Sequence, residues 1–182
     1  MKVAHQIAQL LKAQGIRHVF TVSGGANLHI IHAIADTEGI EYVCPQTEQA
    51  AGFAADAYAR LNGIGCACAT SGPGATNLIT AIGASYYDSV PVLYLTGQVA
   101  TFRMARNYGE RELRERELQP RQVGFQETPI VEIVAPITKH AVTVMQKERV
   151  LYELQKAVAI AKAARMGPVL VDIPDDIQRM QT

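Results

Sequence analysis

Gly65-Cys66-Ala67-Cys68-Ala69-Thr70-Ser71-Gly72-Pro73-Gly74 is the stretch of this chain that decides its fold. Its first six residues are small and mostly apolar, which favours a short strand buried on both faces. The glycine-rich turn at residues 71–74 ends that strand, and a helical pattern follows to about Tyr87. A buried strand that runs through a glycine turn into a helix indicates an α/β arrangement.

The same alternation extends in both directions along the chain. We predict helices at about residues 3–14, 27–36, 49–61, 74–87 and 147–165, and strands at about 18–22, 41–44, 65–70, 92–96, 141–144 and 169–173. Apolar strands that alternate with helices are typical of a parallel sheet covered on both sides. We therefore expect an α/β, three-layer domain with a mainly parallel six-stranded sheet and helices on both faces.

One charged segment interrupts this rhythm between residues 103 and 122. Its acidic and basic residues alternate with few apolar anchors: Arg103, Arg106, Glu110, Arg111, Glu112, Arg114, Glu115, Arg116, Glu117 and Arg121. We interpret the segment as a solvated loop or exposed helix rather than a binding surface.

Composition excludes several classes of function. The chain has 182 residues, enough for one domain with a real core, and its 17 basic and 17 acidic residues balance. A neutral chain without a basic patch argues against nucleic acid and anionic membranes as partners. The N-terminus lacks the apolar segment of a signal peptide, and no apolar run approaches the ~18 residues of a membrane span. Cys44, Cys66 and Cys68 lie in apolar sequence and are expected to be buried thiols, so we expect a cytoplasmic protein.

Three polar turns are predicted to meet at one edge of the sheet. Residues 23–25, 46–49 and 70–74 each follow a predicted strand, and open parallel sheets bind ligands beyond the carboxyl ends of their strands. The glycines of the third turn would let the backbone approach a ligand closely, although such turns also need glycine for shape alone.

Glu48 is the most informative polar residue in these turns. It precedes a helix rich in alanine and glycine, whose small side chains permit close packing against another surface. A carboxyl group in such a dry contact can exchange a proton near neutral pH. The alternative is that Glu48 only stabilises the first turn of its helix electrostatically.

Other chemistries have little support in the sequence. His29 and His32 are spaced as a metal-binding pair on a helix, but no third ligand is evident, so we predict no metal site. Ser71 has neither a Gly-x-Ser-x-Gly context nor an obvious His–Asp partner. The glycine turns match neither the dinucleotide nor the P-loop spacing.

Several segments resemble the thiamine diphosphate enzymes. Residues 46–60 resemble the signature around the activating glutamate of these enzymes, and residues 70–78 resemble the segment that follows it. Five more segments match in family order, at residues 88–92, 96–99, 124–128, 137–140 and 167–174. The resemblance covers nearly the whole chain and is greatest to the large subunits of acetolactate (acetohydroxyacid) synthases.

The resemblance implies both a domain and a set of site residues. Residues 1–182 would form one pyrimidine-binding domain, in which Glu48 is the catalytic residue and activates the cofactor through its pyrimidine ring. Phe125 and Gln126 would reach the substrate side. The other residues that would contact the cofactor are Ser23, Gly24, Thr70, Pro73 and Asn77.

The resemblance also implies a reaction and partners. Enzymes of this kind decarboxylate a small 2-oxo acid and transfer the resulting two-carbon unit; a simple 2-oxo acid decarboxylase and a non-catalytic binding domain remain the alternatives. Family members hold the diphosphate and Mg²⁺ in a second domain with a Gly-Asp-Gly…Asn motif, and some hold FAD in a central domain. Neither domain is recognisable in this sequence. We therefore expect an inactive isolated chain that pairs with a diphosphate-binding domain and forms a homodimer or larger assembly.

Two departures from the acetolactate synthase pattern concern the substrate. Residues 22–25 read Val-Ser-Gly-Gly where those synthases usually have Tyr-Pro-Gly-Gly. Asp175 stands where they usually have lysine in the run Asp-Ile-Pro-Lys-Asp, which reverses a charge near the substrate entrance. Both differences leave activation of the cofactor intact.

Overall fold

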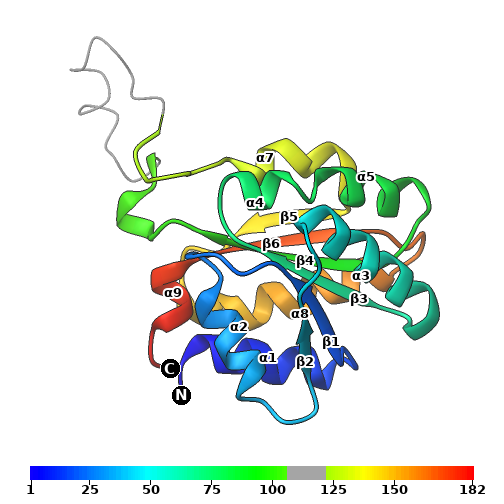
Figure 1. The fold of residues 1–182 in the computed structure, drawn as a ribbon, viewed down its shortest axis with the longest axis horizontal. Coiled ribbons are helices and arrows are strands. Elements are labelled where there is room, and N and C mark those ends of the chain that lie inside the picture. The colour runs from blue at the N-terminus through cyan, green and yellow to red at the C-terminus, as the bar shows by residue number, and fades with distance from the viewer. Residues whose placement is uncertain (106–121) are drawn as a thin grey trace.

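The computed structural model describes residues 1–105 and 122–182. Six strands form one sheet in the order β2-β1-β3-β4-β6-β5, and every pair of neighbours is parallel (Figure 1). The strands are β1 (His18–Thr21), β2 (Glu41–Val43), β3 (Gly65–Ala69), β4 (Val92–Gln98), β5 (His140–Thr143) and β6 (Val169–Pro174). The predicted α/β fold with a six-stranded parallel sheet is confirmed.

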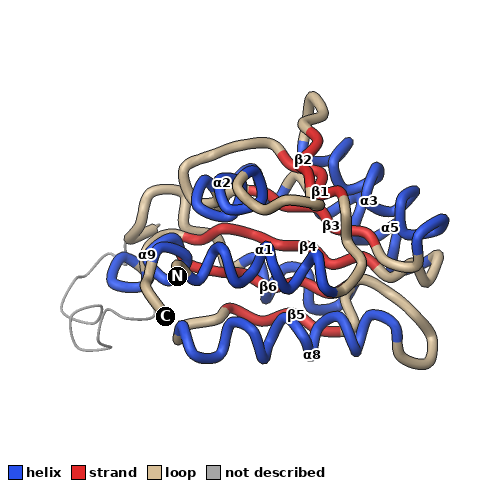
Figure 2. Tube along the Cα trace, turned by 90° about the horizontal axis from the view of Figure 1, so that it is seen from below, coloured by secondary structure: helices blue, strands red, loops and turns tan. Residues whose placement is uncertain are grey.

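Four helices lie on one face of the sheet (Figure 2). They are α1 (Val3–Ala13), α2 (Leu28–Ala35), α8 (Val150–Lys162) and α9 (Asp175–Arg179). Their apolar side chains pack with alternate residues of the central strands, among them Cys66, Cys68, Leu93 and Leu95. This alternation explains why the strands read as continuously apolar, because each face of the sheet has its own core.

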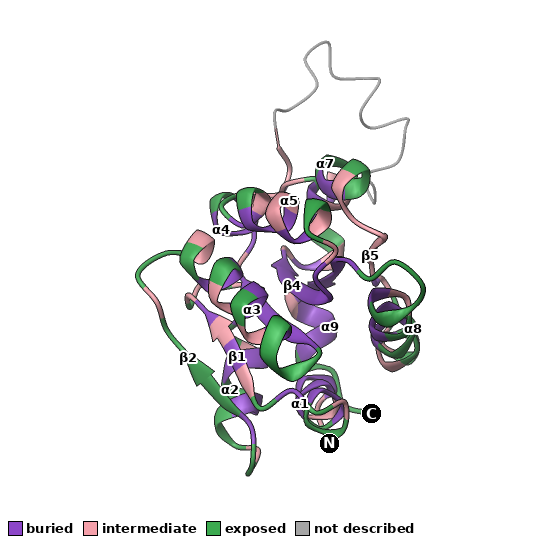
Figure 3. Ribbon diagram, turned by 90° about the vertical axis from the view of Figure 1, so that its right-hand side faces the viewer, coloured by how far each residue is buried: buried purple, intermediate pink, exposed green. Residues whose placement is uncertain are grey.

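The second face is covered by α3 (Glu48–Asn62), α4 (Pro73–Thr76), α5 (Ile79–Tyr87) and α7 (Ile130–Val134) (Figure 3). Small residues allow α3 to approach both β3 and α5 closely. A Cβ atom added to Gly65 would lie 1.9 Å from the backbone oxygen of Ala55, and one added to Gly52 would lie 2.5 Å from Cβ of Ala81. Much of the alanine-rich surface of this helix is therefore used within the domain itself.

Local differences from the sequence-based expectation have physical causes. The helix expected at residues 74–87 is divided into α4 and α5, because Leu78 N–H bonds to the carbonyl of Ala75, three residues back. Helices α7 and α9 were not predicted; each has five residues, too few to show a helical apolar period. Single 3₁₀ turns occur at η1 (Thr101–Arg103), η3 (Ala135–Ile137) and η4 (Lys147–Arg149).

The expectation of three buried thiols is wrong for Cys44. Cys66 and Cys68 are buried in β3, and burial raises the pKa of the Cys68 thiol to about 12. Cys44 is exposed because it follows β2, an edge strand whose three residues are all exposed. Most of the charged run, residues 106–121, lies outside the described residues. Within the described ranges, no helix has the length and apolar character needed to cross a membrane.

Candidate functional site

The parallel sheet brings the predicted turns to one edge, where the strand order changes direction. The chain passes from β1 outward to β2 and then returns to β3 on the other side of β1. The loops after β1 and β3 therefore diverge to opposite faces, and a crevice opens between them. The turns at residues 22–26 and 70–74 meet at the base of this crevice, where Ala26 N–H bonds to the hydroxyl of Thr70.

Thr70 is held between two glycines at the centre of the crevice. A Cβ atom on Gly24 would lie 2.5 Å from Cβ of Thr70, and one on Gly74 would lie 2.7 Å from its Cγ2. The Thr70 hydroxyl accepts a hydrogen bond from Ala26 N–H over 3.1 Å. Gly24 is therefore required for the two loops to meet, and Gly74 leaves room for Thr70 within its own turn.

Glu48 reaches the same cluster from the start of α3. Thr47 caps this helix by accepting a hydrogen bond from Ala50 N–H, so that Glu48 is its first residue. Asn77 donates a hydrogen bond from Nδ2 to Oε2 of Glu48 over 2.9 Å. The other carboxylate oxygen lies 3.1 Å from the position that a Cβ atom on Gly74 would occupy. The Glu48 carboxylate is thus held from two sides at the edge of the crevice.

Asn27 shapes the loop after β1 and was not predicted as a site residue. Its side chain is fully buried, accepts a hydrogen bond from Gly24 N–H over 2.8 Å, and donates to the carbonyl of Val22 over 3.1 Å. The only signal in the sequence is an asparagine soon after two glycines, which is common in turns. Its role depends on burial, which the sequence does not reveal.

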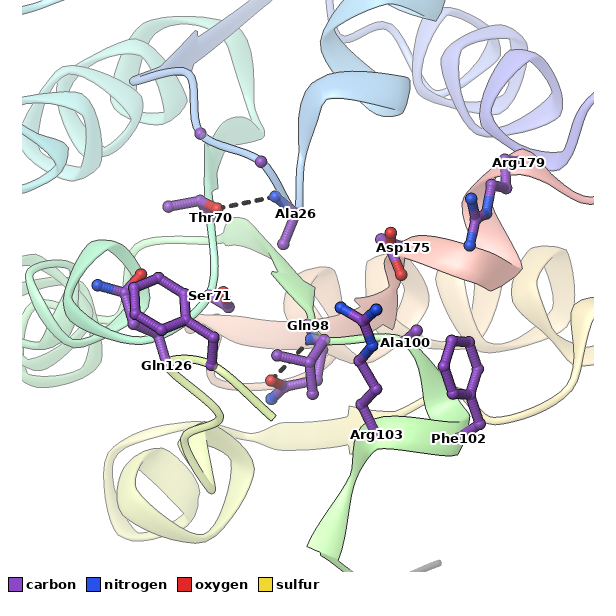
Figure 4. A pocket seen from close by; sticks show the side chains of 14 residues that line it. Ala26, Thr70, Ser71, Gln98, Ala100, Phe102, Arg103, Gln126, Asp175 and Arg179 are labelled. Carbon is purple, nitrogen blue, oxygen red and sulfur yellow. Dashed lines mark hydrogen bonds between the residues drawn. The ribbon is translucent and has the colours of Figure 1, made fainter. Parts of the chain in front are cut away.

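A pocket of about 470 Å³ opens beside the crevice (Figure 4). Gly24, Thr70 and Gln126, all predicted site residues, contribute to its wall, together with Phe125, whose ring is 77% exposed. Gln126 fits against Gly72, where a Cβ atom would lie 2.6 Å from Cβ of Gln126. Gln126 itself has a φ of 59°, a backbone conformation that is uncommon for a residue with a side chain.

The structure places the predicted residues in two adjoining groups. Gly24, Thr70, Glu48 and Asn77 form one cluster through the contacts described above. Phe125 and Gln126 belong to the pocket wall. Ser23 and Pro73 are exposed and stand next to the cluster only as chain neighbours of Gly24 and Gly74.

The far end of the pocket contains Asp175, which the resemblance placed near the substrate entrance, and four residues that the sequence did not connect with a site. Ala100, Phe102 and Arg103 follow β4, and Asp175 and Arg179 belong to α9 after β6. Below them, the buried carboxylate of Asp172 accepts hydrogen bonds from Thr96 over 2.8 Å and from Gln98 over 3.2 Å. These groups meet because β4 and β6 are neighbours in the sheet.

No metal centre is found among residues 1–105 and 122–182. No three His, Cys, Asp or Glu side chains in these ranges gather as metal ligands would. His29 and His32, the spaced pair in the sequence, instead lie on α2, where His32 approaches Asp36 at 3.2 Å.

Comparison with known proteins shows that this chain is similar to several acetolactate synthases. Acetolactate synthase, chloroplastic, from Arabidopsis thaliana is 40% identical over 179 residues, which are 98% of this chain and 24% of that protein. The acetolactate synthase large subunit of Haemophilus influenzae is 40% identical over 95% of this chain and 28% of its own. Acetolactate synthase isozyme 3 large subunit of Escherichia coli is 40% identical, again over 28% of its length.

The chain thus spans about a quarter of the length of the curated relatives that it matches. A family model described as "Thiamine pyrophosphate enzyme, N-terminal TPP binding domain" matches residues 1–118, a range that includes Gly24, Glu48, Thr70 and Asn77. Thiamine pyrophosphate (TPP) is the cofactor called thiamine diphosphate above. By this match, the chain belongs to the thiamine pyrophosphate enzymes, as a member of their N-terminal TPP binding domain family.

Proposed function

We propose that Gly24, Glu48, Thr70 and Asn77 hold the aminopyrimidine end of thiamine diphosphate in a 2-oxo acid carboligase resembling acetolactate synthase. The observation that carries this proposal is the Glu48 carboxylate, oriented by Asn77 at 2.9 Å and lying against a glycine. A carboxyl group fixed in this way can share a proton with a ring nitrogen, and the absence of a side chain at Gly74 leaves the approach of the ring open.

The cluster suits a flat, weakly polar ring. Gly24 and Gly74 have no side chains to fill the space, and the methyl group of Thr70 lies between them. Gly24, Thr70 and Ser71 form the end of the pocket next to the crevice. Among the described residues, no charged side chain lines this end. This chemistry fits a pyrimidine and does not fit a diphosphate, which needs cationic groups or a metal ion.

Glu48 would act by holding and moving one proton. When bound, thiamine diphosphate supplies an electron sink for the carbon–carbon bond that breaks in a 2-oxo acid. Glu48 would bind the pyrimidine nitrogen, accept or return a proton at its free oxygen, and keep its orientation through Asn77. Phe125 and Gln126 would line the substrate side of the pocket.

The rest of the active site would come from other domains. We propose that a diphosphate-binding domain holds the diphosphate through Mg²⁺, that FAD is a further cofactor where a central domain is present, and that the working unit is a homodimer or larger. Exposed apolar side chains support an assembly: Phe53 of α3 is 43% exposed and Tyr87 of α5 is 72% exposed, on the face that carries Glu48.

The Glu48→Gln variant tests this proposal in the complete, cofactor-loaded enzyme. Hydrogen–deuterium exchange at the thiazolium carbon, followed by NMR, should slow by about a hundred- to ten-thousand-fold, because an amide of the same size cannot relay the proton. Binding of the cofactor should be largely retained. Unchanged exchange would mean that Glu48 serves only the start of α3, and a cofactor role would have to be abandoned.

A further inference from the structure

The pocket has two chemically different ends (Figure 4). Thr70, Ser71 and Gln126 lie at one end, next to the crevice, and none of them carries a charge. Asp175, Arg103 and Arg179 lie at the other end, together with the ring of Phe102. The proposed function uses only the first of these ends.

The two arginines are available to bind a ligand. In the described part of the chain, neither Arg103 nor Arg179 has an ion-pair partner, and both are exposed. Arg103 stacks on Phe102, with its guanidinium carbon 5.4 Å from the ring centroid. This arrangement limits the freedom of the side chain and leaves its N–H groups without a hydrogen-bond partner among the described residues. Paired guanidinium groups in a concave site are typical ligands for a carboxylate.

Asp175, the first residue of α9, adds a hydrogen-bond acceptor at the same end of the pocket. Its Oδ1 atom is buried and has no hydrogen-bond partner among the described residues. Asp175 and Arg179 are four residues apart on α9, yet their side chains do not form an ion pair in this structure. A buried oxygen without a partner is costly, so a donor from a ligand would be favourable at this position.

These charged groups stand on a rigid frame. The neighbouring Asp176 accepts hydrogen bonds from Thr101 N–H over 3.0 Å and from its hydroxyl over 2.6 Å, which fastens the turn that carries Arg103 to α9. Gln178 donates to the carbonyl of Ala26 over 2.7 Å and ties α9 to the loop of Gly24. The charged end is therefore positioned relative to the crevice before any ligand arrives.

We infer that this end of the pocket selects a carbonyl substrate with both a carboxylate and a hydroxyl group. Arg103 and Arg179 bind the carboxylate, and Oδ1 of Asp175 accepts a hydrogen bond from the hydroxyl. The inference rests on the proposed function, because it assigns to this pocket the substrate of the same site.

Four small carbonyl compounds test the two preferences separately. 3-Hydroxypyruvate has both groups, pyruvate only the carboxylate, hydroxyacetone only the hydroxyl, and acetone neither. Titration of each into the ¹⁵N-labelled full chain, with the arginine Nε–H and backbone signals observed by NMR, gives four dissociation constants without any cofactor. We expect 3-hydroxypyruvate to bind most tightly and acetone least, with shifts at Arg103 and Arg179 for the two acids only.

Variants assign each preference to its residues. Arg103→Ala and Arg179→Ala should each weaken binding of the two acids by roughly three- to tenfold, the range for an exposed charged hydrogen bond, and leave hydroxyacetone unchanged. Asp175→Ala should remove the advantage of 3-hydroxypyruvate over pyruvate and strengthen pyruvate binding, because a negative charge beside both guanidinium groups is lost. If the alanine variant is poorly folded, Asp175→Asn takes its place. It removes the negative charge while keeping the size of the side chain, so it measures the effect of the charge on pyruvate binding. Arg17→Ala, at the opposite end of β1, is the matched control.

Equal affinities for the four compounds would overturn the inference, as would an acid preference that persists when both arginines are removed. A hydroxyl preference that survives Asp175→Ala would overturn the role of Asp175. None of these outcomes involves thiamine diphosphate or Glu48. Failure of the proposed function would appear in the exchange experiment on Glu48→Gln, so the two failures can be distinguished.

Discussion

Asn77 donates a hydrogen bond to Glu48 across 2.9 Å and so joins the end of α4 to the first residue of α3. The donor is neutral, so it orients the carboxylate without cancelling its charge. Twenty-nine residues separate the two side chains in the sequence. They meet only because β3 carries the chain from the end of α3 back to the crevice.

Asn77→Asp should disturb proton transfer at Glu48 more than Asn77→Ala does. Two carboxyl groups at hydrogen-bond distance cannot both be ionised cheaply, so the pair would share a proton. In the complete enzyme, thiazolium exchange in the aspartate variant should reach its plateau at a higher pH than in the wild type. In the alanine variant, thiazolium exchange should be slower than in the wild type, but it should depend on pH in the same way. Identical pH profiles for the wild type and the aspartate variant would contradict the contact.

Gly74→Ala should impair cofactor binding far more than it affects folding. The added methyl group would overlap Cγ2 of Thr70 at 2.7 Å and approach Glu48 at 3.1 Å, and Thr70 cannot retreat because Gly24 lies against its other side. The complete enzyme is first freed of its cofactor and then titrated with thiamine diphosphate and Mg²⁺ by calorimetry. The variant should bind the cofactor at least tenfold more weakly than the wild type, a difference of about 1.4 kcal/mol.

The matched control is Gly83→Ala in α5, where an added Cβ atom has no neighbour within 4 Å. Replacing this partly exposed helical glycine by alanine should raise the free energy of unfolding by about 0.5–1 kcal/mol and leave cofactor affinity unchanged. Equal affinities for the Gly74 and Gly83 variants would show that the space beside Gly74 is not used.

Asp56→Ala should destabilise the domain strongly. The buried Asp56 carboxylate accepts hydrogen bonds from Arg60 Nε and from the Ser85 hydroxyl, each over 2.7 Å, and Ser85 in turn contacts the buried Tyr94 hydroxyl at 2.9 Å. Removal of the carboxylate takes one hydrogen-bond partner from the buried Ser85 hydroxyl and should lower the free energy of unfolding, measured in urea, by about 2–4 kcal/mol.

Asp88→Ala is the control for that measurement. Asp88 pairs with the same Arg60 at 2.6 Å, but its side chain is 58% exposed. Exposed ion pairs contribute little, so this variant should unfold close to the wild type. A comparable loss in both variants would mean that the ion pairs with Arg60, and not the buried network, stabilise this part of the domain.

Stability should fall as the pH drops below the usual titration range of histidine. Burial lowers the pKa of His140 below its ordinary value of 6.5, and the charge of Lys156 acts in the same direction. The unfolded chain therefore binds the proton more readily than the folded one. The contribution of His140 to the free energy of unfolding is therefore fully present above pH 6.5 and is lost as the pH falls through the folded pKa.

His140→Gln should flatten this dependence between pH 7 and 5.5, measured by urea unfolding at each pH. Part of the slope should remain, since burial also lowers the pKa of His29. The double variant with His29→Gln should therefore be flatter still. An unchanged slope in the double variant would assign the pH dependence to other groups.

Much of the fold could be predicted from local pattern. The run from Gly65 to Gly74 indicates a buried strand and a glycine turn, and its repetition along the chain predicts a parallel sheet. A parallel sheet aligns the carboxyl ends of its strands, so Gly24, Glu48 and Thr70 were expected at one edge. These predictions succeeded because each depends on the apolar period and on turn residues, which act within a few positions of the chain.

The sequence by itself thus determined the α/β alternation and the edge at which a site would form. Only the tertiary structure decided which side chains meet there. Asn77 bonds to Glu48 and Asn27 bonds to the loop of Gly24. Arg103, Asp175 and Arg179 line the same pocket. Helix α9 is too short for a periodic signal, and the exposure of Cys44 follows from the position of β2 at the edge of the sheet. Such contacts depend on strand order and on packing between distant segments, and local propensity carries no information about either.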